Sequence, residues 1–139
     1  MNEATTVPQE GAGKVESRLK PLILVVDDQA VNIQILHALL MEEFDVCMAL
    51  NGADALAVCA ASRPDLILLD VVMPNVDGYT VCSQLKADAT TRHIPVIFVT
   101  GHLDREQEER GFAVGGADFI TKPFHAGVVL GRVRALLGL

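Results

Sequence analysis

Three aspartates, one threonine and one lysine stand at the ends of short apolar runs, and they are the candidates for chemistry in this chain. They are Asp27 and Asp28, Asp70, Thr100 and Lys122. Carboxylates that lie close together raise one another's pKa unless a cation neutralises them. Because the ligands would be oxygen atoms, with no histidine or cysteine among them, a hard ion is favoured, and Mg²⁺ fits best.

Phosphoryl transfer onto an aspartate suits this set of side chains. A divalent cation attracts phosphoryl oxygens and leaves one carboxylate free to act as a nucleophile. Lys122 offers a compact positive charge to the phosphoryl group and Thr100 offers a hydroxyl donor. Taken singly, an acidic pair is often a helix cap and a strand-end threonine often reflects β-propensity. Asp70 is harder to explain in this way, because it ends an apolar run and two valines follow it.

Five apolar runs predict the strands that would position these residues. The runs are Leu22–Val26, Asp45–Leu50, Leu66–Leu69, Val96–Val99 and Asp118–Thr121. Three of them are nearly continuous in apolar residues, which is typical of strands buried on both faces of a parallel sheet. Strand–helix alternation repeated five times predicts a doubly wound α/β fold, with a five-stranded parallel sheet of order 2-1-3-4-5. In such sheets the functional residues lie at the carboxyl ends of the strands.

Helical spacing of apolar residues predicts the covering layers. In Ala30–Glu43 the spacing places Val31, Ile35 and Leu39 on one face, and the last helix begins near His125 and repeats Val129, Val133, Leu136 and Leu137. The stretch Leu103–Gly111 differs, because seven consecutive residues in it are polar. A helix there has few apolar anchors, so we expect it to shift more easily than its neighbours.

Composition places limits on the class of protein. The 139 residues are 50% hydrophobic and carry a net charge of −7. This length and apolar content predict one globular domain, residues 21–139, after a flexible leader, residues 1–20. The negative charge argues against direct binding to nucleic acid or to an anionic membrane. With no predicted membrane span or signal peptide, the expected location is cytoplasmic.

The motifs resemble those of one family, the receiver domain of two-component response regulators, from about Leu22 to Leu139. The segments that carry the resemblance are Leu24–Asp28, Asp70–Gly78, Val99–Gly101 and Thr121–Phe124. The resemblance implies a flavodoxin-like fold with five helices and a usually cis peptide bond before Pro123. It makes Asp70 the phosphoacceptor and Lys122 and Thr100 its catalytic partners.

The resemblance also implies a metal site, a switch and a donor. Asp27, Asp28, Asp70 and the backbone carbonyl of Val72 would hold Mg²⁺, and Thr100 and Phe119 would be the switch residues. The phosphoryl group would come from a histidine kinase or a histidine phosphotransfer protein. The surface of the fourth helix, fifth strand and fifth helix would transmit the signal. The domain itself would perform only self-phosphorylation from small donors and self-dephosphorylation.

Three departures or variable positions qualify the resemblance. The switch aromatic is a phenylalanine, which has no ring hydroxyl or nitrogen, so packing alone must distinguish the two states. Val72 and His102 occupy the positions that tune phosphoryl lifetime in the family, and His102 is equally explained as a solvated loop residue. Asp118 and Arg132 match charged dimer positions while Val128 replaces an acidic partner, so we expect a weak or phosphorylation-dependent homodimer at most.

The sequence disfavours two other functions, and it leaves open what the receiver controls. A haloacid-dehalogenase-like phosphatase also uses a strand-end Asp nucleophile, but it needs a second Asp where this chain has Val72. A pseudo-receiver that acts without phosphorylation is disfavoured because every acceptor-site residue is present. The chain fits both a stand-alone receiver and the input domain of a longer regulator. The run from Pro64 to Lys122 resembles receivers joined to cyclic-di-GMP synthases or HD-type phosphodiesterases.

Overall fold

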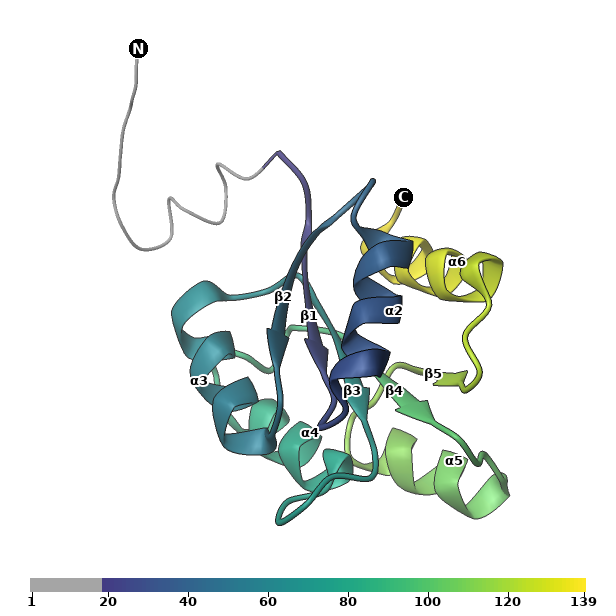
Figure 1. The fold of residues 1–139 in the computed structure, drawn as a ribbon. Coiled ribbons are helices and arrows are strands. Elements are labelled where there is room, and N and C mark those ends of the chain that lie inside the picture. Colours follow the sequence, from purple (N-terminus) through teal and green to yellow (C-terminus); the bar gives the residue numbers. More distant parts are fainter. Residues whose placement is uncertain (1–18) are drawn as a thin grey trace.

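The computed structural model describes residues 19–139, and strands alternate with helices along this part of the chain (Figure 1). Nearly all of the predicted leader, residues 1–20, lies outside the described residues. The strands are β1 (Leu22–Val26), β2 (Asp45–Ala49), β3 (Leu66–Asp70), β4 (Val96–Thr100) and β5 (Asp118–Thr121). The helices are α2 (Ala30–Leu40), α3 (Gly52–Ser62), α4 (Gly78–Ala87), α5 (Arg105–Ala113) and α6 (Ala126–Leu137).

The five strands form one parallel sheet of order β2-β1-β3-β4-β5, which confirms the predicted order. The chain crosses over the sheet through a helix after each strand. As a result α2 and α6 cover one face, and α3, α4 and α5 lie on the other (Figure 1). The sheet order places β1 and β4 on either side of β3, so the residues that follow these three strands share one edge of the sheet.

Alternate residues of the central strands pack into two separate apolar layers. Leu24, Leu69 and Phe98 belong to the layer under α3 and α4. Val25 and Leu68 belong to the layer under α2 and α6. All five residues of β3 are buried, including its terminal Asp70. Burial on both faces explains why this run reads as continuously apolar in the sequence.

The predicted helix Ala30–Glu43 ends earlier than expected and buries a different face. It ends at Leu40, where the carbonyl accepts hydrogen bonds from the amides of Glu43 and Phe44 and turns the chain toward β2. Two of the three residues expected to face the core are exposed, Val31 at 55% and Ile35 at 43%, whereas Leu39 is partly buried against the core. The buried residues are instead Ile33, Leu36 and Leu40. This second stripe is also apolar, so periodicity alone did not choose between the two faces.

The other helices follow the sequence more closely. In α6, Val129 and Val133 are fully buried, as predicted. Helix α5 begins after Asp104, whose carboxylate accepts from the amide of Gln107, and its one buried residue is Gly111. The prediction that a helix in this region has few apolar anchors is therefore confirmed, and its easier displacement stays a prediction. In the described part of the chain, no helix has the length and apolar character needed to cross a membrane.

Candidate functional site

The residues singled out from the sequence meet at the carboxyl edge of the sheet. Asp27 follows β1 directly, Asp70 ends β3, Thr100 ends β4 and Lys122 follows β5. Hydrogen bonds between neighbouring strands continue just past these ends: the Val71 amide donates to the Val99 carbonyl, and the Lys122 amide donates to the Thr100 carbonyl. The sheet thus fixes the backbone beneath each of these side chains.

The three carboxylates form a cluster of the kind that holds a metal ion. Asp27, Asp28 and Asp70 each offer an oxygen, and these oxygens lie within 4.8 Å of one another. Asp27 is 1% exposed; its Oδ1 accepts from the amide of Gln29, while its Oδ2 has no hydrogen-bond partner. A buried carboxylate oxygen without a donor is costly unless a cation satisfies it. The donor set therefore fits a hard divalent cation, with Asp28 exposed at the entrance.

Lys122 is the cation nearest to the cluster. Its Nζ lies 3.3 Å from Asp70 Oδ1 and 3.6 Å from Asp27 Oδ2. Burial and the negative charge of Asp27 raise the pKa of Asp70 to about 6, even though Lys122 acts in the opposite direction. One ammonium group is thus too little to balance three carboxylates. Asp70 is nevertheless mostly ionised at neutral pH, as a nucleophile must be.

The loop between β3 and α4, residues 71–77, is held tightly at its base. The Gly78 amide donates to the Val71 carbonyl, and a Cβ on Gly78 would lie 2.3 Å from the carbonyl oxygen of Asp70. Only glycine permits this close approach of two backbone segments. Asp77 closes the loop by capping α4 through the amide of Thr80. We call residues 71–77 the acceptor loop. Val72 is 76% exposed in it, beside Asp70 in the sequence.

Thr100 is turned toward the loop that leads to α5. Its hydroxyl donates to the carbonyl of His102 and accepts from the His102 amide, at 2.9 and 3.1 Å. No hydrogen bond joins Thr100 to Asp70. The His102 ring is 79% exposed and pairs with Asp104 at 3.1 Å, which fits the solvated-loop interpretation of this residue. The hydroxyl of Thr100, one of the two switch candidates, is thus engaged with the His102 backbone and not with Asp70.

Phe119 is already inside the protein. It is 4% exposed and packs against Phe98 and Phe112, with ring centroids 5.4 Å apart in each pair. The ring fits against Gly111 of α5, where a Cβ would lie 2.3 Å from Phe119 Cζ. Gly111 thus provides the space that the buried ring occupies. The peptide bond between Lys122 and Pro123 is cis, as the resemblance implied.

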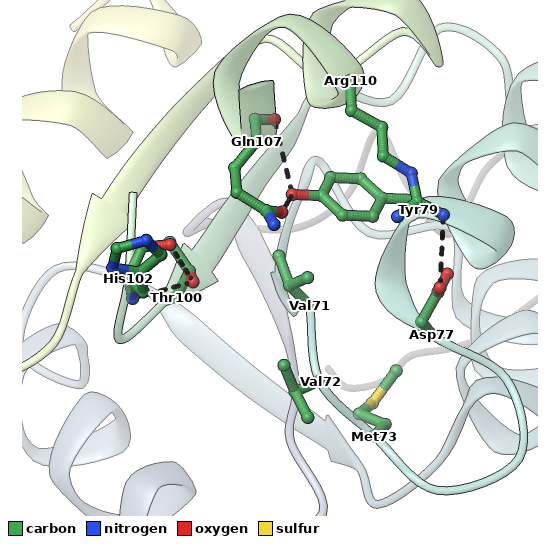
Figure 2. Close-up of a pocket in the computed structure, with 9 residues that line it drawn as sticks. All are labelled: Val71, Val72, Met73, Asp77, Tyr79, Thr100, His102, Gln107 and Arg110. Carbon is green, nitrogen blue, oxygen red and sulfur yellow. Dashed lines mark hydrogen bonds and ion pairs between the residues drawn. The ribbon is translucent and has the colours of Figure 1, made fainter. Parts of the chain in front are cut away.

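A pocket of about 360 Å³ lies between the acceptor loop and α5 (Figure 2). Thr100, His102 and Val72 line it, together with residues that sequence analysis did not single out. Those include Tyr79 in the first turn of α4, and Gln107 and Arg110 of α5. Tyr79 and Gln107 are 28 residues apart, so no local spacing could have linked them. Their contact follows only from the packing of α4 beside α5.

Comparison with known proteins identifies the family of this arrangement. The model of the response regulator receiver domain matches residues 23–134. "Response regulator PleD" of Caulobacter vibrioides is 48% identical over 82% of this chain and 25% of its own length. "DNA-binding dual master transcriptional regulator RpaA" of Synechocystis is 41% identical over 84% of this chain and 49% of its own. The chain therefore spans about a quarter to a half of the length of these relatives.

Solved structures agree with the sequence comparisons. The chemotaxis protein CheY4 of Vibrio cholerae superposes with a TM-score of 0.82 at 27% identity, over 85% of this chain and 99% of the other. The signal receiver domain of a histidine kinase from Syntrophus aciditrophicus has a TM-score of 0.78 at 37% identity, over 85% and 90% of the two chains. The comparisons favour neither the phosphatase nor the pseudo-receiver alternative.

Proposed function

The chain belongs to the response regulator receiver domain family, and from that premise we propose that Asp70 is its phosphoacceptor. One observation carries the proposal: Asp70 is buried in an acidic cluster able to hold a cation, and of the three carboxylates it is the one that accepts a hydrogen bond from the Lys122 ammonium. Asp27 and Asp28 are less suited to the attack. Asp27 lies deeper and Asp28 is exposed, so both are better placed as ligands.

The transfer is a substitution at phosphorus. A carboxylate oxygen of Asp70 attacks a phosphoryl group carried by a histidine, forming a P–O bond while the P–N bond breaks and its electron pair returns to the imidazole. Mg²⁺ bound by Asp27, Asp28, Asp70 and the Val72 carbonyl would neutralise the charge that gathers on the phosphoryl oxygens. Lys122 stabilises the same charge, and its ammonium keeps Asp70 oriented before the transfer.

The phosphoryl group then acts on its surroundings as a new anion. It carries about −1.5 to −2 charges and three acceptor oxygens. We propose that Thr100 leaves the His102 backbone and donates to one of these oxygens. The loop that joins Thr100 to α5 moves with it. Because the Phe119 ring packs against Gly111 of α5, a displacement of α5 decides whether this packing is kept. The surface of α5, β5 and α6 then presents the signal, because the displaced segment leads into α5 and β5 pairs with β4, the strand that ends at Thr100.

Histidine kinases or histidine phosphotransfer proteins are the proposed donors, since response regulators receive phosphoryl groups from kinases. The proposed output is a module joined to the receiver or a separate partner. Relatives with different names match this chain at similar identity. We therefore propose that the receiver performs the step that these relatives share, which is acceptance of the phosphoryl group. The domain itself is proposed to catalyse only self-phosphorylation from small donors and self-dephosphorylation.

Labelling with acetyl phosphate tests the acceptor. Incubation with Mg²⁺ should add one phosphoryl group to the protein, as seen by intact mass, and Asp70→Asn should remove this product. Asp45→Asn, which changes an exposed carboxylate at the start of β2, is the matched control and should label normally. Equal labelling of Asp70→Asn and the wild type would overturn the assignment, and mapping of the modified peptide would then show which residue reacts.

A further inference from the structure

Helix α5 is attached to the protein by few apolar contacts. Gly111 is its one buried residue, and the other side of the helix is exposed and charged. Besides the ring contact between Phe112 and Phe119, a group of polar and aromatic contacts attaches it to the end of the acceptor loop and the start of α4. Four residues make these contacts, Asp77, Tyr79, Gln107 and Arg110, and we call them the clasp.

Three contacts between side chains form the clasp, and a backbone oxygen adds a fourth contact (Figure 2). The Tyr79 hydroxyl donates to the side-chain oxygen of Gln107, and the Gln107 backbone oxygen lies 3.4 Å from the same hydroxyl. The Arg110 guanidinium stacks over the Tyr79 ring, with its carbon 4.4 Å from the ring centroid. The same guanidinium pairs with Asp77 at 3.5 Å. Tyr79 is 3% exposed, so its ring gives the two α5 residues a fixed surface to bind.

The clasp joins α5 to the segment that surrounds the candidate acceptor. Asp77 is the last residue of the acceptor loop, and the next residue, Gly78, packs its backbone against Asp70. Arg110 therefore reaches from α5 to within one residue of a backbone contact with Asp70. The clasp residues differ from Thr100 and Phe119, the two residues that the family resemblance marks as the switch, although the Tyr79 ring packs against Phe98, which in turn packs against Phe119.

We propose that the clasp is a restraint on switching, which holds α5 against the acceptor loop and opposes the rearrangement that phosphorylation requires. The inference rests on the proposed function. If Thr100 turns to a phosphoryl group, His102 loses both hydrogen bonds to its hydroxyl, and the segment that enters α5 is released. Gln107 lies in the first turn of α5, so displacement of that turn pulls on Tyr79. The clasp must open, or α5 must stay in place.

The proposed restraint predicts the direction in which the affinity for an anion at Asp70 changes when the clasp is opened. Opening the clasp beforehand removes interactions that only the unswitched arrangement makes, so the switched arrangement becomes easier to reach. An anion that favours the switched arrangement then binds more tightly. A merely structural role predicts the opposite change in affinity, because loosening a site normally weakens the binding of its ligand.

Beryllofluoride titration at saturating Mg²⁺, followed by NMR, is the test. Tyr79→Phe removes only the hydroxyl, and Arg110→Ala removes both the stacking and the ion pair. We expect each to bind beryllofluoride about two- to tenfold more tightly than the wild type. Arg110→Lys keeps the charge facing Asp77, so its affinity for beryllofluoride should lie between those of Arg110→Ala and the wild type. The matched control is Arg105→Ala, which removes an arginine of the same helix that pairs with the exposed Glu109; it should bind like the wild type.

Hydrogen exchange of the α5 amides, measured without the analogue, gives a second readout. Tyr79→Phe and Arg110→Ala should speed exchange across residues 105–113, and Arg105→Ala should not. If the wild type binds beryllofluoride and the clasp variants bind with equal or lower affinity, the restraint is wrong while the proposed function stands. If the wild type itself fails to bind, the proposed function falls and the restraint falls with it.

Discussion

Replacing Asp70 by Asn should stabilise the metal-free protein, although it removes the proposed acceptor. Burial and the neighbouring Asp27 raise the pKa of Asp70 from 3.8 to about 6. Each pKa unit corresponds to about 1.4 kcal/mol, so keeping Asp70 ionised in the folded state costs up to ~3 kcal/mol. Asn lacks this charge but also loses the ionic contact with Lys122. We therefore expect a gain of about 1–3 kcal/mol in the free energy of unfolding at neutral pH.

The pH dependence identifies the cause of this gain. A carboxyl group whose pKa is raised on folding contributes most to stability below its unfolded pKa, and the contribution is lost as the pH rises through the folded value. The advantage of Asp70→Asn should thus be small at pH 4, grow toward pH 6 and be complete above pH 7. Bound Mg²⁺ should stabilise the wild type and narrow the difference, because the cation binds only the folded cluster.

Urea unfolding in EDTA, at several pH values and then with Mg²⁺, measures these differences directly. Asp45→Asn controls for the loss of one negative charge from an acidic protein, and it should change stability little at any pH. If Asp70→Asn is no more stable than the wild type at pH 7.5, the repulsion argument fails. A gain that is equally large at pH 4 would point to some cause other than ionisation.

Three further outcomes are expected. Gly111→Ala should destabilise the protein by about 1–3 kcal/mol in thermal or urea unfolding, because the added Cβ meets the Phe119 ring; Gly127→Ala, with open space around it, should be neutral or stabilising. The phosphorylated protein should lose its phosphoryl group slowly, since Val72 cannot orient a water; decay of labelled Val72→Asn should be faster, and His102→Ala should resemble the wild type. Sedimentation with beryllofluoride and Mg²⁺ should show a monomer or a weak dimer, and a tight activated dimer would contradict the incomplete set of surface ion pairs.

The sheet was predictable because its strands are short, buried and continuously apolar. Leu66–Leu69 is apolar at every position, so its strand assignment and central place do not depend on periodicity. The edge at which the candidate residues meet then follows from parallel topology alone. Strand ends needed only small changes: β3 and β4 each extend by one residue to include Asp70 and Thr100, and β2 ends one residue early.

Side-chain direction was less accessible from the sequence. Helix α2 has two apolar stripes. Contacts with the sheet and with α6, elements that are distant in the sequence, determine which stripe is buried. Contacts between elements were inaccessible for the same reason, since Tyr79 and Arg110 meet only because α4 and α5 pack side by side. The state of Thr100 depends on the backbone path at His102, and residue types do not encode that path locally.

The hydrogen bonds of Thr100 set a condition on any anion that arrives at Asp70. A hydroxyl has a single proton, and in this structure that proton is committed to the carbonyl of His102. It cannot be donated fully to a backbone carbonyl and to an oxygen of the anion at the same time. The two hydrogen bonds therefore exclude each other. Either the hydroxyl donates to the bound anion and releases the His102 carbonyl, or it stays bonded to that carbonyl. A signal read through this residue is binary in each molecule, and graded responses arise only from the fraction of molecules in each state.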